Sequence, residues 1–424
     1  MKRKLLIIEL NEFNVELLEN YADKFGLKNI RRLLKMPRNN TSCDELKEHH
    51  GLDPWVQWVS IHTGKPLRTH GIVRNNDVEN LKYKQFWEIL SEKGISSGIW
   101  GAMNAKRNKS NLCHFFLPDP WNYSEKAYPK NLDNFLYLPR YYSRNYTNFS
   151  KIKIIRGLLK LLKFFIYPPL ILRLTKNFYK IFRFIITDGF NNNNLFVLFD
   201  LILSEVFIYY KKIFKPDVSI IFMNSLAHFQ HHYWDPDKLN QKGKICLENI
   251  DFILGKLLRE IDKKEPLIIF NGMSQKNVKN EGYCIYKLKN AKKFLNDLNI
   301  KFIDIEESMT NDGKIKFHCI EDLKKAKNTI DNIFIKNKKI FFTENISSKR
   351  NFTLFWQLDF YEKILEDCYF SVFNKNFMFY KYFILLAERS GSHIPEGEII
   401  HRHFNLPKKI DNNQFFDYIL AHFE

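Results

Sequence analysis

The chain has few cysteines and no close pair of them. Its six cysteines are scattered along 424 residues, and no two form a C-x-x-C motif. They are Cys43, Cys113, Cys246, Cys284, Cys319 and Cys368. This spacing argues against a disulfide framework and indicates reduced thiols in a cytosolic protein.

Long hydrophobic runs are also absent. After a basic start, the N-terminal apolar run has only five or six residues before Glu9, too few for the apolar region of a signal peptide. It predicts a buried first strand, and a cytoplasmic location is the default expectation. Within residues 151–215 the longest charge-free apolar stretch runs from Phe164 to Leu172, and Pro168-Pro169 interrupt it, so it cannot span a bilayer.

Acidic residues are in deficit. The chain has 47 Asp and Glu against 66 Lys and Arg, a formal net charge of +19. Because 45% of the residues are hydrophobic and 16% aromatic, the chain is not a disordered polycation and can bury a large core. The basic balance favours an anionic partner such as a phosphorylated or sulfated sugar, a nucleic acid or an anionic lipid. The charge is spread along the chain without a helix-turn-helix, zinc-finger or RNA-recognition signature, so a nucleic-acid partner is not predicted.

The remaining pattern alternates buried strands with amphipathic helices. Apolar runs at residues 5–10, 217–223 and 266–270 predict buried strands, each followed or preceded by a helical pattern. This alternation predicts an α/β protein with a doubly wound, mostly parallel sheet. The expected parts are an α/β core from residues 1–150, 216–280 and 386–424, a helical insertion at 151–215 and a small α+β cap at 281–385. Aromatic and proline residues dominate 114–146 and predict an irregular covering segment.

Residues 151–215 place Lys and Arg at helical intervals among Leu, Ile and Phe, and Pro168-Pro169 divide them into two expected helices. Two interpretations stay open. The helices pack on the sheet or on another subunit, which would make the protein an oligomer. Alternatively they form a basic amphipathic surface that makes peripheral contact with an anionic membrane at its inner face.

The most informative stretch is DPWVQWVSIHTGKPLRTHGI, residues 53–72. Asp53 is a suitable N-cap and Pro54 a suitable first residue for a helix that runs to about His62. The N-terminus of this helix would direct backbone N–H groups at an anion such as phosphate or sulfate.

This stretch resembles the nucleophile region of the alkaline phosphatase superfamily, especially its type I phosphodiesterase and nucleotide pyrophosphatase branch, which is related to the sulfatases. Thr63-Gly64 and His70-Gly71-Ile72 stand at the family spacing, and Trp58 falls where that branch often has an aromatic residue. The resemblance implies an alkaline-phosphatase-like fold. The nucleophile position falls on Pro54, which cannot act as one, so Asp53 is left as a carboxylate nucleophile, a metal ligand or a simple N-cap.

The metal ligands implied by the resemblance are unevenly preserved. One site corresponds to Asn224, His228 and His393, with His231 and His232 a turn further on. The other falls on residues that bind zinc poorly or not at all, namely Asn11, Pro54, Phe270 and Asn271. We therefore expect a single divalent ion, zinc or alternatively manganese, on Asn224, His228, His232 and His393.

Three functions remain open at this stage. The first is a divergent metal-dependent hydrolase or transferase acting on a phosphate (phosphodiester) or sulfate ester of an anionic small molecule or glycan, with Asp53, His62 and His70 as candidate catalytic residues and Trp58, Thr63, Asn11 and Asn271 as candidate substrate contacts. The second is an inactive relative that binds an anionic glycan or nucleotide. The third is a membrane-surface or assembly protein that works through residues 151–215. Polar residues retained at the strand ends favour the first.

Overall fold

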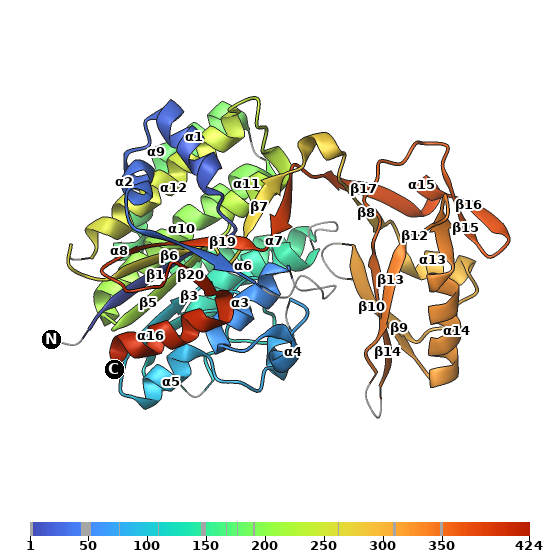
Figure 1. The fold of residues 1–424 in the computed structure, drawn as a ribbon, viewed down its shortest axis with the longest axis horizontal. Helices are drawn as coiled ribbons and strands as arrows, with labels where there is room; N and C mark the ends of the chain where they lie inside the picture. The colour runs from blue at the N-terminus through green and yellow to red at the C-terminus, as the bar shows by residue number, and fades with distance from the viewer. Residues whose placement is uncertain are drawn as a thin grey trace. The chain divides into compact units, whose positions relative to one another are not determined.

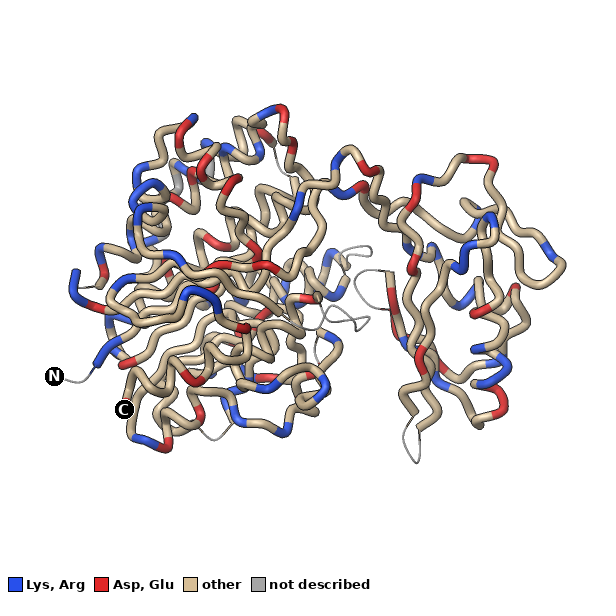
Figure 2. The backbone as a smooth tube through the Cα atoms, viewed as in Figure 1, with Lys and Arg blue, Asp and Glu red and all other residues tan. Residues whose placement is uncertain are grey.

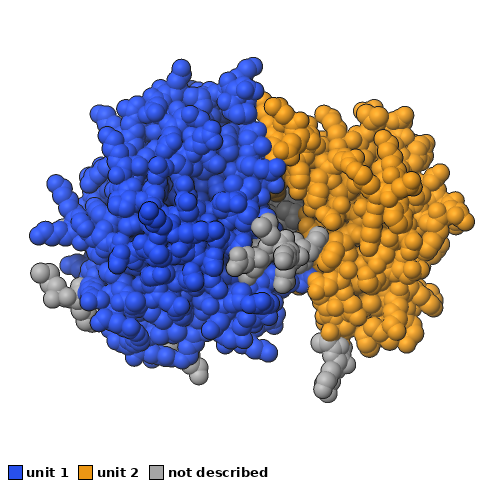
Figure 3. Space-filling model, in the orientation of Figure 1, with its two compact units in different colours: residues 1–143, 147–277, 391–424 blue, residues 144–146, 278–390 orange. Residues whose placement is uncertain are grey.

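The computed structural model divides into two compact units (Figure 3). Unit 1 comprises residues 1–143, 147–277 and 391–424, and unit 2 comprises residues 144–146 and 278–390. The structure describes residues 3–43, 52–75, 77–108, 110–145, 150–166, 168–175, 177–189, 191–261, 263–307, 311–347 and 351–424.

Unit 1 is built on a large, mostly parallel sheet, as the sequence predicted. In the order of pairing its strands are β20 (Lys409–Asp411), β2 (Arg38–Ser42), β19 (Glu396–Arg402), β6 (Leu267–Phe270), β1 (Leu5–Leu10), β5 (Val218–Met223), β3 (Ser97–Trp100) and β4 (Cys113–Leu117). Strand β19 runs antiparallel to both of its neighbours, β2 and β6, and the other pairs are parallel. The central strands β1, β5 and β6 are buried along their whole length, which explains their continuous apolar runs.

Helices cover both faces of this sheet (Figure 1). One face packs against α1 (Val15–Phe25), α2 (Lys28–Leu34), α10 (Asn192–Phe214), α11 (Ser225–Tyr233) and α12 (Gln241–Arg259). The other face packs against α3 (Pro54–Thr63), α5 (Phe86–Glu92) and α16 (Phe415–Phe423). Side chains of β1 alternate between the two cores, Leu6 and Ile8 on the first and Leu5 and Ile7 on the second. The doubly wound α/β class is therefore confirmed. The short α4 (Leu67–His70) and the 3₁₀ turns η2 (Asp77–Asn80) and η4 (Asn412–Gln414) complete the elements on this side.

The insertion at residues 151–215 forms more helices than the sequence predicted. The two expected helices are instead α7 (Lys151–Phe165), α8 (Pro168–Thr175), α9 (Phe178–Asp188) and α10. The asparagine-rich start of α10 explains one of the breaks, because the Asn191 side chain caps that helix by accepting from the backbone N–H of Asn194. Helix α10 is long and apolar enough to cross a membrane, but 67% of its most apolar 18-residue stretch is buried inside the structure. The helix packs mainly on α12.

The expectation of an irregular segment at residues 114–146 was wrong for most of its described part. Strand β4 occupies its start, and α6 (Leu132–Asn145) occupies its end with Pro139 inside the helix. Helix α6 forms in spite of the proline because Leu132, Phe135 and Leu136 share one buried face. Tertiary packing outweighs the local signal here.

Unit 2 is a smaller α+β unit with its own apolar core, and residues 281–385 lie within it. Its larger sheets have the orders β13-β14-β10-β9 and β12-β11-β15-β16, and β17 pairs with β8. The strands are β8 (Cys284–Leu288), β9 (Asp304–Glu307), β10 (Asp312–Phe317), β11 (Ile333–Ile335), β12 (Lys338–Lys339), β13 (Phe341–Asn345), β14 (Phe352–Leu358), β15 (Tyr369–Val372), β16 (Lys375–Met378) and β17 (Phe383–Glu388). The helices are η3 (Lys279–Glu281), α13 (Ala291–Asp297), α14 (Ile320–Asp331) and α15 (Phe379–Tyr382).

Candidate metal centre

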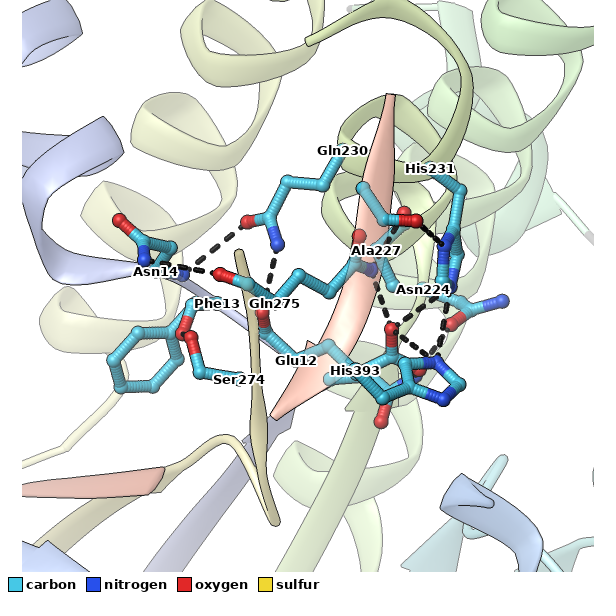
Figure 4. Close-up of polar contacts among 12 residues, drawn as sticks. Glu12, Phe13, Asn14, Asn224, Ala227, Gln230, His231, Ser274, Gln275 and His393 are labelled. Carbon is cyan, nitrogen blue, oxygen red and sulfur yellow. Dashed lines mark hydrogen bonds and ion pairs between the residues drawn. The ribbon is translucent and has the colours of Figure 1, made fainter. Parts of the chain in front are cut away.

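Three side chains converge at one point of unit 1 (Figure 4). Glu12 Oε2 lies 3.0 Å from His231 Nε2 and 3.2 Å from His393 Nε2, and the two Nε2 atoms are 3.2 Å apart. Each residue directs one potential ligand atom at the others. We call Glu12, His231 and His393 the triad.

The fold places the triad where α/β sheets bind ligands. Glu12 follows the carboxyl end of β1, and His231 lies on α11, the helix that follows β5. His393 lies on β18 (Gly391–Ile394), which pairs with β7 (Ser274–Asn277), the strand after β6. The carboxyl ends of adjacent parallel strands meet at one edge of the sheet, so residues distant in sequence come together there.

The backbone of Glu12 has a conformation that few side chains adopt. Its φ is +58°, in the left-handed region. The structure holds it there, because its N–H donates to Asn271 O at 2.9 Å and its carbonyl accepts from Gln230 Nε2 at 2.8 Å. Strain of this kind persists only where neighbours fix the conformation, and it is common at functional sites.

Two amide side chains orient the Glu12 carboxylate. Asn11 Nδ2 donates to Oε1 at 2.8 Å, and Gln275 Nε2 donates to Oε2. Burial favours the neutral carboxyl, but the charges and hydrogen bonds of His393 and His231 oppose it, and together they hold the pKa of Glu12 well below its usual value. The residue is therefore a carboxylate, the form that binds a cation.

The orientation of His231 is fixed by its second nitrogen. Nδ1 lies 3.2 Å from the backbone oxygen of Gly391, which can only accept, so Nδ1 carries a proton, and loss of the proton on Nε2 would leave that nitrogen for a metal. This close approach requires glycine at 391, because a Cβ there would collide with Gln275 Oε1 and the backbone of Gln230.

The triad fits a divalent metal ion. Ligand atoms at 2.0–2.1 Å from a tetrahedral ion are about 3.3 Å apart, close to the separations within the triad. Two imidazoles and one carboxylate are a common ligand set for zinc and for other first-row metals, and they leave further positions for substrate. The His231 and His393 side chains are 12% and 18% exposed, whereas that of Glu12 is 2% exposed, so a ligand would approach from the histidine side.

Of the metal ligands predicted from sequence, only His393 belongs to the triad. Asn224 is not part of the triad. Its Oδ1 accepts a hydrogen bond from Asn11 Nδ2 at 2.9 Å. His228 stacks on Phe196 with ring centroids 4.1 Å apart, and His232 packs against His228 at 4.7 Å. One helical turn therefore separates the predicted ligand His228 from His231, the histidine that reaches Glu12.

The predicted substrate contacts lie in the interior, and two of them, Asn11 and Asn271, bond to Glu12. Trp58 Nε1 donates to Asn11 Oδ1 at 2.8 Å, and Asn271 bridges the backbones of Phe13 and Glu398. Thr63 Oγ1 bonds back to Val59 O within α3. None of these four side chains is exposed.

The position expected for a second metal is filled by aromatic rings. Trp58 makes edge-to-face contacts with Phe222 and Phe270, with centroids 5.8 and 5.7 Å apart. Phe270 is the residue that the sequence matched to a superfamily carboxylate ligand, and here it belongs to a buried hydrophobic core. Phe270 therefore packs against aromatic rings, and its side chain has no atom that could coordinate a metal.

The structure holds both predicted acid–base histidines in the interior. His62 Nε2 lies 2.7 Å from Glu9 Oε1, and both side chains are 2% exposed or less. His70 Nδ1 accepts from the Ile72 N–H at 3.0 Å, so Nε2 carries the proton and donates to Ser60 Oγ at 3.1 Å. Burial lowers the pKa of His70 to about 4, which keeps it neutral near pH 7. Both rings are thus held by contacts of the interior, and their acid–base role stays a prediction.

Asp53 is the N-cap residue of α3, as predicted, although its side chain makes no capping hydrogen bond. It is partly exposed. Asn11 and Gln275 donate hydrogen bonds to Glu12, and Gly391 O accepts one from His231. Asp53 as a nucleophile stays a prediction.

Sequence reasoning missed two of the three members of the triad. Glu12 stands beside the Asn11 position that the superfamily uses, and only the positive φ turns its side chain toward the histidines. His231 was visible as one of three histidines in five residues, but the family spacing pointed to His228. The available signal was a carboxylate directly after the first strand together with a histidine cluster after β5.

Asp200 positions the helix that carries His231, and we expect it to make stability depend on pH. It accepts from the backbone N–H groups of Asn224 at 3.3 Å and Ser225 at 2.8 Å. Burial raises its pKa from 3.8 to about 6. Ionisation of Asp200 therefore destabilises the folded state. This cost is absent below about pH 4 and reaches ~3 kcal/mol above about pH 6.

Urea unfolding of wild type and Asp200→Asn between pH 4.5 and 7.5 measures this effect. Because the variant cannot ionise, the stability of the wild type relative to the variant is expected to decrease by about 2 kcal/mol between about pH 4.5 and pH 7.5. A difference that stays constant over this range would contradict the assignment.

The fold defines the class of this protein. A mostly parallel sheet with helices on both faces, and with a cluster of potential metal ligands near the carboxyl ends of its strands, is the arrangement of a doubly wound α/β protein that binds its ligand at that edge. The sequence profile of the family "Type I phosphodiesterase / nucleotide pyrophosphatase" matches residues 5–273, more than half of the chain. The chain belongs to this family of metal-dependent phosphoryl-transfer hydrolases within the alkaline phosphatase superfamily.

Solved structures with similar folds include two enzymes named for phosphorus chemistry. The murine ectonucleotide pyrophosphatase / phosphodiesterase 5 in complex with AMP is 11% identical, with a TM-score of 0.48 over 100% of this chain and 95% of that one. Phosphonoacetate hydrolase from Sinorhizobium meliloti in complex with phosphonoacetate is also 11% identical, with a TM-score of 0.46 over 99% and 96%. No curated protein sequence matches this chain.

Proposed function

We propose that this protein is a metal-dependent hydrolase of a phosphodiester that uses one divalent ion held by Glu12, His231 and His393. The convergence of these three ligand atoms within 3.0–3.2 Å carries the proposal. A bound divalent ion supplies Lewis acidity for an oxygen of the phosphoryl group. Zinc is the first choice for this ligand set and manganese the second.

The residues around the triad perform the positioning. Asn11 and Gln275 fix both oxygens of Glu12, and Gly391 fixes the ring of His231. Outer contacts of this kind typically contribute about 10- to 100-fold in metal affinity or activity. The partly exposed histidine edge is the side on which an anionic substrate would enter, and the basic balance of the chain favours its approach.

Pro54 limits the possible nucleophiles. Because proline has no nucleophilic atom, a covalent intermediate at that position is excluded, and we propose that water attacks directly. The water oxygen forms the new bond to phosphorus and releases a proton to solvent, the ester P–O bond breaks, and the leaving alkoxide takes up a proton from solvent. His62 and His70 take no part because they are buried in hydrogen bonds to Glu9 and Ser60.

Hydrolysis of bis(p-nitrophenyl) phosphate by protein loaded with zinc or manganese tests this function. We expect turnover that falls by roughly 100-fold or more in His393→Ala, a larger loss than outer-shell changes cause. Asp53→Asn is expected to keep the wild-type rate if water is the nucleophile. p-Nitrophenyl phosphate and p-nitrophenyl sulfate measure the preference between ester classes.

Pro54 stands at the nucleophile position of the superfamily and Phe270 at one of its metal-ligand positions, and this favours a second candidate function. In this case the protein binds an anionic nucleotide or glycan on the metal without hydrolysing it. Metal binding that requires the triad, without turnover of any of the three esters, would support this candidate over the hydrolase. A rate in metal-loaded His393→Ala equal to that of wild type would contradict the single-metal mechanism.

A further inference from the structure

Helix α7 carries an exposed apolar face. Six large apolar side chains of the α7 segment and the residue after it are 47–79% exposed. They are Ile152, Ile155, Leu158, Leu159, Leu162 and Ile166. Soluble proteins rarely leave contiguous apolar side chains of this number in water.

The spacing of these residues makes them a continuous stripe. At 3.6 residues per turn, the six positions fall within a sector of about 120° around the helix. The buried side chains of α7, Phe164 and Phe165, fall outside that sector, and so does Gly157, where a Cβ would collide with Leu138 of α6. Helix α7 is therefore already packed on unit 1 by one face and presents a second apolar face outward.

Basic side chains border the exposed stripe. Lys153, Arg156, Lys160 and Lys163 occupy the neighbouring sector, and Lys160 Nζ lies 4.2 Å from the ring centroid of Tyr137 on α6. None of these four side chains forms a salt bridge with any residue in the described ranges. They are free to pair with external anions.

The lack of acidic residues around α7 is local. Lys and Arg alternate with Asp and Glu along most of the chain (Figure 2), but residues 134–187 contain no Asp or Glu. Residues 150–187 contain nine Lys and Arg. The same segment contributes ten of the 21 exposed large hydrophobic side chains among the described residues.

The exposed apolar stripe and the cations beside it together indicate which kind of partner fits α7. A protein partner would be expected to cover the apolar stripe with a matching apolar surface, and it would leave several cations beside the stripe without counterions. A bilayer with anionic headgroups satisfies both features, because apolar side chains enter the acyl boundary while Lys and Arg remain at the headgroups. We propose that α7 binds the interface of an anionic lipid bilayer through the face formed by Ile152, Ile155, Leu158, Leu159, Leu162 and Ile166.

The experiment is sedimentation of the full-length protein with vesicles of phosphatidylglycerol mixed with phosphatidylcholine, and with vesicles of phosphatidylcholine alone. The wild type is expected to bind the anionic vesicles and to be released as salt rises toward about 0.5 M, where the Debye length falls below 5 Å. The double variant Leu159→Glu/Leu162→Glu is expected to bind them roughly tenfold more weakly or not at all. Both leucines are 61% exposed, so the substitutions do not disturb the core.

Leu365→Glu is the matched control, because Leu365 is 69% exposed in unit 2, away from the stripe in sequence, and should bind like wild type. Circular dichroism of the double variant confirms that it is folded. Three results would overturn the proposal: no binding of wild type to anionic vesicles, equal binding of the double variant, or a wild-type dimer that the double variant dissociates while neither binds vesicles. The last would mean that a second copy of the chain covers the face.

Discussion

Glu12→Gln is expected to abolish binding of a divalent metal while the protein stays folded. Glutamine keeps the size of the side chain, but it replaces Oε2, the atom 3.0 and 3.2 Å from the two Nε2 atoms, by a neutral oxygen or an NH₂ group. Loss of a direct carboxylate ligand should lower affinity by more than the roughly 100-fold that outer-shell changes reach. Elemental mass spectrometry of purified protein, and calorimetric titration with zinc, measure the effect.

His231→Ala and His228→Ala form the decisive pair, because both residues lie on α11 one turn apart. The geometry predicts metal loss in the first and metal retention in the second. The spacing of the superfamily motif predicts the reverse. Retention of metal in His231→Ala together with loss in His228→Ala would show that the ion binds at the family position and not at the triad.

Glu9→Ala is expected to destabilise the protein by about 1–3 kcal/mol without removing the metal. The substitution leaves His62 buried without its partner at 2.7 Å, among the rings of Trp58 and Trp87. A buried polar group left without its hydrogen-bond partner typically costs about that much. Urea unfolding and metal analysis of the same preparation give both readouts.

The double variant Glu9→Leu/His62→Phe is the control, because it replaces both polar groups by apolar ones. It should recover most of the lost stability, as apolar replacements of buried pairs often do. If Glu9→Ala instead kept wild-type stability and lost hydrolytic activity, His62 would have the acid–base role that the sequence suggested. That result would contradict the structural role inferred from its burial.

Much of the fold could be predicted from sequence because its strands are buried on both faces. Continuous apolar runs at β1, β5 and β6 give a strong local signal, and the superfamily motifs follow them in order. The apolar environment of Phe270, which packs on Trp58 in the core, was also expected from its residue type. Elements without such a signal were misjudged, as in α6, where tertiary packing accommodates Pro139.

The site was less predictable because it depends on small rotations. Whether His228 or His231 faces Glu12 is decided by the orientation of α11, and a change of one turn leaves the sequence pattern unaltered. Glu12 is directed at the histidines by a single positive φ, which depends on distant contacts from Asn271 and Gln230. Neither determinant is local in sequence.

The left-handed backbone at residue 12 is held in place by the same side chain that forms the centre. A non-glycine residue in this conformation costs roughly 1–2 kcal/mol. Glycine at residue 12 would remove that cost, but it would also leave Asn11 Nδ2, Gln275 Nε2 and the two imidazoles without their buried partner. The glycine variant is therefore expected to lose stability as well as the centre, because one carboxylate serves both the fold and the site.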